Sequence, residues 1–245
     1  MVAIVKKDIV TLQREQVVSI VDDSQVRIIG PGNVDQFKIL SSGRVSVSEL
    51  YKLGLTNNYV VDLGLSVKWA NFNIGASACY EYGAYFAWGE IMPKNSYSEG
   101  NSITAKIGSS ELRKKGIVNE CGNLTSNYDA ASINWRGKFR IPTQKDFDEL
   151  IEKCEWRWLS IVVSEKNAVN GYYIKSRVNG NSIFLPAAGY DGTSSYNVGS
   201  YGHYWSSTVN ESSSSSAYNL SFNSSSKNTG NDSRYYGLTV RPVTE

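Results

Sequence analysis

The sequence predicts an α+β fold in which antiparallel strands accompany one or two helices, preceded by a small β-rich N-terminal domain. Three observations lead to this prediction. Residues 140–154 contain the clearest helix, a run of short strands with hairpin signals follows it, and the first 58 residues differ in composition from the rest. A helix that precedes a run of antiparallel strands indicates α+β rather than repeated strand–helix–strand units.

Length and charge limit the classes of function. At 245 residues and 41% hydrophobic, the chain can bury one core of roughly 150–190 residues and still leave a small accessory domain. Its net charge of +2 comes from 25 Lys and Arg against 23 Asp and Glu, without a basic run. Nucleic acid is therefore not an expected partner, because no stripe of charge would neutralise its phosphates.

Membrane and disulfide signals are missing as well. No stretch approaches the ~18–20 apolar residues that cross a bilayer, and residues 1–10 are charged where a signal peptide is apolar. We therefore expect no membrane insertion and no export signal in this chain. The odd number of cysteines and their wide spacing predict free thiols rather than a disulfide framework or a zinc site at Cys79, Cys121 and Cys154.

The N-terminal segment, residues 1–58, lacks Trp and is rich in Val, Ile, Asp and Lys. Apolar residues alternate in 16–21 and 25–29, which is typical of short strands joined by turns. A break at 54–58 marks the expected boundary. We expect a β-rich attachment or oligomerisation domain at 1–58 and a ligand-binding domain at 59–245.

The second domain opens with strand-like and aromatic segments. Residues 60–70 predict a hairpin, and residues 81–90 concentrate large rings that supply bulk for a core. Residues 92–127 are polar and weakly patterned, apart from a short basic helix at 110–115. We expect this stretch to be a long excursion.

The clearest helix has a strong start signal. Thr143 is a good N-cap with Asp146 three residues later, and the apolar positions that follow recur at helical spacing. Residues 171–176 and 182–186 then read as strands joined by the Asn179-Gly180 turn. Between helix and strands, Trp156 and Trp158 would share a face of a strand or point apart on a helix, and the pattern does not decide.

Residues 190–236 are dominated by Ser, Asn and Tyr. Ordered pieces interrupt them at 204–208, 218–222 and 236–243, which read as core strands carrying polar loops. If Tyr218, Leu220 and Phe222 share one face of a strand, then the polar residues between them lie on the other. Trp205 is expected in the core, as are Trp69, Trp88 and Trp135, although Trp205 could instead be a platform for a sugar ring.

This composition favours recognition. Tyr provides a large amphipathic contact area at small entropic cost, while Ser and Asn provide adaptable hydrogen bonds. The alternative is a solvated loop region without a partner. The expected ligand contacts are Tyr190, Tyr196, Tyr201, His203, Asn219, Ser221, Asn223 and Asn231.

Several motifs together resemble a domain found in gut bacteria and their phages. They span most of 60–243 and include VDLGLSVKWA at 61–70, EYGAYFAWGE at 81–90, FRIPT at 139–143, NSIFLPAAGY at 181–190, YWSS at 204–207 and YGLTVRPV at 236–243. That domain is related to the C-type lectin fold. The resemblance therefore implies a C-type lectin-like domain at 59–245.

The place of the Ser/Asn/Tyr-rich stretch, just before a strand ending Val-Arg-Pro-Val, is similar to that in the variable proteins of diversity-generating retroelements. In that family, error-prone copying at adenines diversifies a ligand-binding face. This resemblance implies a variable region at 190–236. It also implies a receptor-binding or adhesin function, in a phage virion tail or on a bacterial cell surface.

The expected partner is a protein or a glycan on a cell surface, and a homo-oligomer, trimeric by analogy with phage fibres, is expected too. The alternative is a fixed cell-surface interaction module of the same fold. We expect no metal, because the Glu-Pro-Asn and Trp-Asn-Asp motifs of calcium-dependent lectins are missing, and no cofactor.

An enzyme is the remaining alternative, since formylglycine-generating enzymes share the C-type lectin-like fold that the resemblance implies. Their chemistry uses a cysteine pair late in the chain, and no cysteine follows Cys154 here. His203 is the only histidine, and no GxSxG, Walker, GxGxxG or HExxH motif is present. We therefore expect no catalytic residues.

Overall fold

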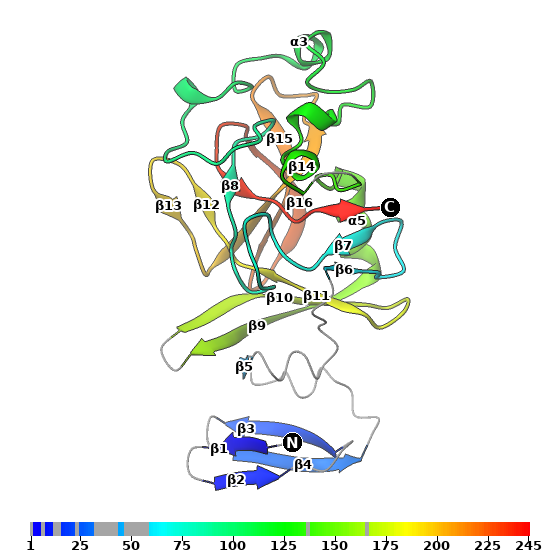
Figure 1. The fold of residues 1–245 in the computed structure, drawn as a ribbon, viewed down its shortest axis with the longest axis vertical. Helices are drawn as coiled ribbons and strands as arrows, with labels where there is room; N and C mark the ends of the chain where they lie inside the picture. Colours follow the sequence, from blue (N-terminus) through cyan, green and yellow to red (C-terminus); the bar gives the residue numbers. More distant parts are fainter. Residues whose placement is uncertain are drawn as a thin grey trace.

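The computed structural model describes residues 59–135, 138–164 and 167–245, together with the strands that lie within residues 2–46 (Figure 1). Strands account for 39% of the structure and helices for 15%, distributed over several sheets with few helices. The α+β prediction is therefore wrong, and the chain is mostly β. It failed because only one helix longer than two turns forms among the described residues, while polar segments that lack strand-like alternation also fold as strands.

The structure describes five strands before residue 59. β1 (Val2–Val5) pairs with β2 (Asp8–Thr11), and β3 (Gln16–Asp22) pairs with β4 (Gln25–Pro31), each in antiparallel fashion. β5 (Arg44–Ser46) pairs in parallel with a strand of the C-terminal part, β9. One sheet of the C-terminal part thus includes a strand that lies before the expected boundary at 58. The attachment role of the N-terminal segment stays a prediction.

The first large sheet has the order β11-β10-β9-β5 and contains β9 (Cys154–Ser164), β10 (Asn167–Ser176) and β11 (Ser182–Pro186). The Asn179-Gly180 turn joins β10 to β11 as expected, with Gly180 at a φ of 78°. Trp156 and Trp158 both lie on β9 and share one face, where each ring contacts Tyr172. This placement answers the question that the sequence pattern left open.

The second large sheet has the order β16-β15-β14-β17-β8. Its strands are β8 (Tyr85–Phe86), β14 (Tyr201–Val209), β15 (Ser216–Asn223), β16 (Lys227–Ser233) and β17 (Leu238–Thr239). Figure 1 shows the β9–β10–β11 sheet running across the lower end of β14–β16. The ring of Phe222 on β15 lies between them, because it contacts both Trp156 and Trp158 on β9.

The predicted helix forms as α5 (Gln144–Lys153). Thr143 Oγ1 accepts a hydrogen bond from the Asp146 amide at 3.2 Å, and Asp146 Oδ2 accepts one from the Thr143 amide at 2.7 Å. Phe147 and Leu150 are buried in the same cluster as Leu220 and Phe222 of β15. The helix thus covers one face of the second sheet and leaves the opposite face to other partners.

Smaller elements complete the fold. The predicted hairpin at 60–70 forms as β6 (Val60–Val61) and β7 (Lys68–Ala70), joined by β18 (Val243–Thr244) in a three-stranded sheet. β12 (Tyr190–Asp191) pairs with β13 (Ser195–Tyr196). The short helices among residues 59–245 that the structure describes are α3 (Ser109–Lys114), α4 (Ala130–Trp135), η2 (Glu99–Asn101) and η3 (Ser126–Tyr128).

The tryptophans expected in the core are mostly there. Trp69, Trp88 and Trp205 are each at most 1% exposed, and Trp135 is partly buried against a core cluster. Trp205 Nε1 donates to the Phe86 carbonyl at 2.7 Å, and Trp88 Nε1 donates to that of Ser206 at 2.8 Å. Trp205 is therefore a core residue rather than a surface platform.

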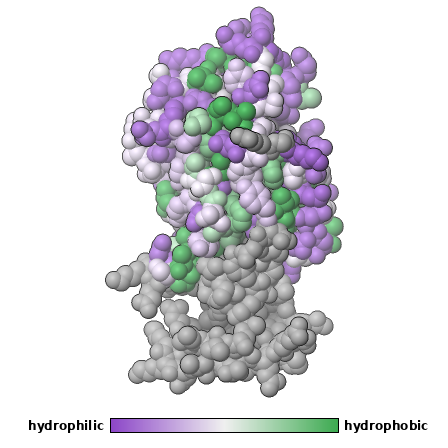
Figure 2. All heavy atoms as spheres, viewed as in Figure 1, coloured by the Kyte–Doolittle hydropathy of each residue, from purple (hydrophilic) through white to green (hydrophobic). Residues whose placement is uncertain are grey.

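The face drawn in Figure 2 carries hydrophobic residues only in small patches separated by hydrophilic ones, with hydrophilic side chains dense around α3. None of the helices in the part of the chain that the structure describes has the length and hydrophobicity to cross a membrane. A ligand that meets this face would contact mainly polar groups and isolated apolar side chains.

The three cysteines are free, as the sequence predicts, and differ in accessibility. Burial raises the pKa of the Cys79 thiol to about 11 and that of Cys154 to about 12, whereas Cys121 is exposed. Because the thiolate is the reactive form, iodoacetamide at pH 8 is expected to modify Cys121 alone in the folded protein. Mass spectrometry should find one modified thiol before unfolding and three after it, and rapid labelling of Cys79 in the folded chain would contradict the prediction.

Candidate ligand-binding surface

The register of β14, β15 and β16 decides which side chains share a face. Tyr201 pairs with Asn223 and His203 pairs with Ser221. Because directly paired residues point to the same side of a sheet, these side chains lie on one face. Asn231 pairs with Tyr218 and so lies on the opposite face.

That opposite face is the core side. Tyr204, Leu220 and Phe222 are each at most 1% exposed and belong to the cluster that α5 covers. Their alternation with Asn219, Ser221 and Asn223 follows the sequence prediction. Asn231 is exposed on the edge strand β16, and it lies on the face that α5 covers rather than on the outer face. The structure therefore separates it from the other expected contacts.

Aromatic side chains gather on the outer face. We call these side chains the aromatic row: Tyr235, Tyr236, Tyr190, Tyr196, His203 and Tyr201. The centroids of neighbouring rings lie between 4.5 and 6.1 Å apart. Tyr190 stands at its centre and contacts Tyr196, His203 and Tyr236. The row therefore joins residues from β12, β13, β14 and the segment after β16 into one surface.

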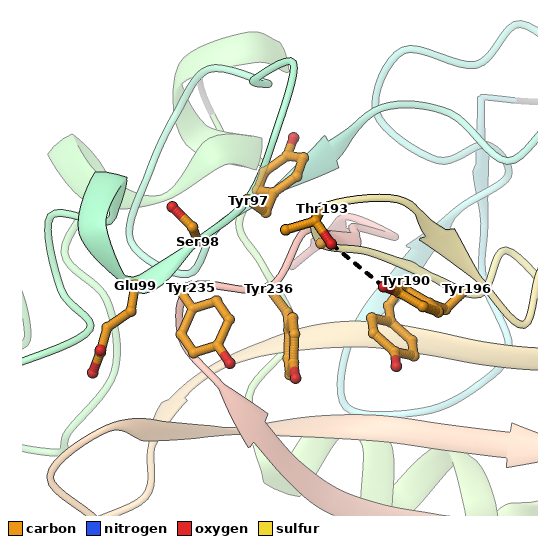
Figure 3. A pocket seen from close by; sticks show the side chains of 9 residues that line it. Tyr97, Ser98, Glu99, Tyr190, Thr193, Tyr196, Tyr235 and Tyr236 are labelled. Atoms are coloured by element: carbon orange, nitrogen blue, oxygen red, sulfur yellow. Dashed lines mark hydrogen bonds between the residues drawn. The ribbon is translucent and has the colours of Figure 1, made fainter.

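Two grooves lie along the row. The tyrosine groove, of about 490 Å³, is lined by Tyr97, Ser98, Glu99, Tyr190, Gly192, Thr193, Tyr196, Tyr235 and Tyr236 (Figure 3). The serine groove, of about 430 Å³, is lined by Trp158, Asn170, Gly199, Ser200, Tyr201, Asn223, Ser224 and Ser225. The sequence-predicted contacts Tyr190 and Tyr196 line the first groove, and Tyr201 and Asn223 line the second.

His203 is held in place by a small polar network. Its Nδ1 lies 3.1 Å from Asp232 Oδ2, and the same oxygen accepts a hydrogen bond from Asn219 Nδ2 at 2.5 Å. Asn219 is only 1% exposed, so it orients Asp232 from below the surface and has no open path to a ligand. The network fixes the ring of His203 between Tyr190 and Tyr201.

Asn223 shapes the serine groove through the turn after β15. Its Oδ1 accepts hydrogen bonds from the amides of Ser225 at 2.9 Å and Ser226 at 3.0 Å. This side chain therefore positions Ser224 and Ser225, which line the groove. Ser221 is partly exposed between His203 and Asn228, in the middle of the outer face.

Sequence reasoning missed several lining residues. Tyr235 and Tyr236 fall inside the Tyr-rich stretch, so their composition was a usable signal. Tyr97 lies in the expected polar excursion, where nothing in the sequence signals a binding role. Contacts with distant residues hold it in place, since its hydroxyl donates to the carbonyl of Tyr85 and its ring packs against Gly237, which has no side chain. Trp158 was left without a role.

Three phenols of the tyrosine groove have a raised pKa and are neutral near pH 7. Burial raises the pKa of Tyr97 and Tyr190, and a hydrogen bond with Tyr235, followed by burial, raises that of Tyr236 to about 12. Hydrogen bonds with Ser194 and Thr193 lower the pKa of Tyr196. Tyr97, Tyr190 and Tyr236 thus offer ring faces and hydroxyl groups rather than phenolate charge. Within the described residues, no group of three metal-ligating side chains is present, and His203 has Asp232 and Asn219 as hydrogen-bond partners.

One comparison with known proteins gives a match. A family model described as a domain of unknown function, DUF8237, matches residues 160–243, about a third of the chain. The matched stretch runs from β9 to β18 and includes the whole aromatic row. No curated protein and no solved structure matches the chain. The C-type lectin-like fold implied by the resemblance is thus corrected: this is a mostly β chain without a recognised structural neighbour, similar to DUF8237 over its C-terminal third.

Proposed function

We propose that this chain is a non-enzymatic binding protein that contacts its ligand through the aromatic row and the two grooves beside it. The observation that carries the proposal is the row itself, whose rings come from distant parts of residues 190–236 and meet on one face. Rigid tyrosines with adaptable Ser and Asn neighbours are a composition that binding surfaces use. The ligand in this proposal is a protein or a glycan on a cell surface.

The scaffold beneath the row supports a role in recognition. On β14 and β15, buried residues such as Tyr204 and Leu220 alternate with outward ones such as His203 and Ser221. A rigid sheet holds contact residues more precisely than loops do, so less entropy is lost when a ligand binds. An enzyme is less well supported, because His203 is bonded to Asp232 and Asn219 rather than to a nucleophile.

A paired substitution tests the proposal. Tyr196 is 41% exposed and Tyr201 is 38% exposed, so replacing both with Ser should remove the ends of the row without opening the core. Labelled protein would be applied to a glycan array and to intact bacterial cells. We expect specific binding that the double variant loses by at least tenfold, equivalent to about 1.4 kcal/mol.

The matched control is Asn231→Ala, on the opposite face of the same sheet, which should bind like the unmodified protein. Thermal unfolding of each variant would verify that folding is unchanged. Equal binding by the double variant and the control would refute the role of the row.

Diversification of this surface is part of the proposal. The tyrosines of the row and the outward Ser and Asn residues beside them can change while the buried residues on the same strands keep the sheet intact. Sequencing the 3′ end of the gene and its flanking DNA across a natural population tests this. Substitutions confined to adenine-containing codons in 190–236 are expected, and a segment as constant as residues 60–188 would leave a fixed interaction module.

A further inference from the structure

The tyrosine groove has a distinctive charge. Of its lining residues, Glu99 is the charged one. Two more carboxylates lie near the rings: Asp191 Oδ1 accepts a hydrogen bond at 3.1 Å from the amide of Gly192, which lines the groove, and Asp232 is bonded to His203. Burial raises the pKa of Tyr190 and a hydrogen bond with Tyr235 raises that of Tyr236, and the charge of Asp232 adds a smaller contribution in the same direction to both. The groove therefore combines neutral rings with a negative potential.

The rings expose their faces at several angles. Tyr190 and Tyr196 are stacked with an interplanar angle of 19°, Tyr190 and Tyr236 meet at 60°, and Tyr235 and Tyr236 meet at 51°. Figure 3 shows Tyr235, Tyr236 and Tyr190 side by side, with Tyr97 across from them. Because the face of an aromatic ring carries partial negative charge, such an arrangement attracts a cation.

The margin of the groove already holds an ammonium group in this way. Lys94 Nζ lies 5.5 Å from the ring centroid of Tyr97 and 2.8 Å from Glu90 Oε2. Glu99 has only an exposed pair with Lys106, at 3.4 Å, which contributes little and exchanges readily. Glu99 can therefore turn to a ligand.

Hydration favours a cation without N–H donors. The hydroxyl of Tyr97 donates to the Tyr85 carbonyl and accepts from the Lys94 amide at 3.0 Å, and that of Tyr196 lies 3.4 Å from Thr193 Oγ1. A primary ammonium is strongly hydrated and must exchange that water for acceptors on three N–H donors. A quaternary ammonium needs only ring faces and nearby negative charge.

We propose that the tyrosine groove binds a quaternary ammonium group, of the kind carried by choline or trimethylated lysine. The inference rests on the proposed function, because it names the ligand chemistry of the same surface. The rings of Tyr190, Tyr196 and Tyr236 contact the methyl groups, and Glu99 and Asp232 supply the compensating charge.

Titration calorimetry with choline and with its neutral isostere 3,3-dimethyl-1-butanol tests the proposal. Both have the same shape, so hydrophobic contact alone would bind them equally. Cation–π attraction is worth about 0.5–2 kcal/mol, so choline should bind roughly 2- to 30-fold more tightly. Equal affinities, or no binding of either compound, would overturn the proposal.

Variants of one exposed position sharpen the test. Tyr196→Phe keeps a ring face and should bind choline like the unmodified protein, whereas Tyr196→Leu should bind several-fold more weakly. Glu99→Gln should weaken choline and leave the isostere unchanged, and Asn231→Ala should affect neither. Choline binding that is indifferent to both Tyr196→Leu and Glu99→Gln would count against this site.

Two further ligands distinguish which kind of molecule carries the quaternary ammonium group. Phosphocholine stands for a decorated glycan or headgroup, and a peptide with one trimethylated lysine stands for a protein; the tighter of the two identifies the source. If choline fails while the array binding still depends on Tyr196 and Tyr201, only the ligand class is wrong. If the array binding is also indifferent to those tyrosines, the proposed function fails as well.

Discussion

Arg241→Met is expected to lower the free energy of unfolding by about 3–5 kcal/mol, because it removes a buried cation that ties several segments together. Arg241 is 0% exposed. Its Nε donates to Asn73 Oδ1 at 2.7 Å, and its Nη1 and Nη2 donate to the carbonyls of Ala70 at 3.2 Å and Phe184 at 2.9 Å. Methionine has a similar length but removes the guanidinium donors from all three acceptors.

Urea unfolding followed by tryptophan fluorescence measures the loss. Arg177→Met is the matched control, since Arg177 is exposed and lies 3.9 Å from Glu155, a surface pair worth about 0–1 kcal/mol. Arg241→Lys should fall between the two, because one ammonium cannot reach acceptors in three directions. Similar unfolding midpoints for the Arg241 and Arg177 variants would show that the buried network does not hold the fold.

Gly202→Ala is expected to destabilise the protein by about 2–3 kcal/mol and to weaken ligand binding as well. A Cβ at this position would lie 2.0 Å from Phe222 Cζ and 2.4 Å from its Cε2. Gly202 pairs directly with Phe222, so the ring lies across the bare backbone. Because Tyr201 and His203 flank this glycine, any shift of β14 that relieves the overlap moves the aromatic row.

The same unfolding assay and the array binding assay check this prediction. Gly100→Ala is the control, since no atom lies within 4 Å of its Cβ position. Adding Phe222→Leu to Gly202→Ala should recover part of the stability, a coupling that residues in contact show. If Gly202→Ala unfolds at the same urea concentration as Gly100→Ala, the ring must move aside at no cost, and the prediction fails.

Local signals in the sequence predicted part of the fold. The capping pair Thr143 and Asp146 and the helical spacing after it located α5, and Asn179-Gly180 located the β10–β11 turn. The alternation of Leu220 and Phe222 with polar residues assigned the faces of β15. Each of these features depends on residues within a few positions of one another, which is why the pattern alone was sufficient.

The fold class was wrong because several strands carry no local signal. β16 reads Lys-Asn-Thr-Gly-Asn-Asp-Ser, without one hydrophobic residue, and forms because β15 provides a hydrogen-bonding edge. Its register also puts Asn231 on the face opposite Ser221. Neither fact can be read from the strand itself, since pairing partners decide both.

The candidate site was predictable in composition but not in geometry. The tyrosines of residues 190–236 indicated recognition, yet the row forms only because Tyr190, His203 and Tyr236 meet across three separate segments. Tyr97 lines the tyrosine groove beside them, and it comes from a polar loop outside the Tyr-rich stretch. Its position follows from the space that Gly237 leaves, a contact between residues 140 positions apart.

Inward and outward side chains alternate one by one at residues 201–204 of β14 and 220–223 of β15, and this alternation has an evolutionary consequence. A single inserted or deleted residue in either strand would exchange the two sets, burying His203 or Ser221 and exposing Tyr204 or Leu220. New specificities are therefore expected from substitution at constant length within these two stretches. Changes in length can be accommodated where the register is already irregular, between Trp205 and Val209, and where the chain turns, as at residues 210–215 and 224–226. Natural relatives should differ in length there while keeping both stretches in phase.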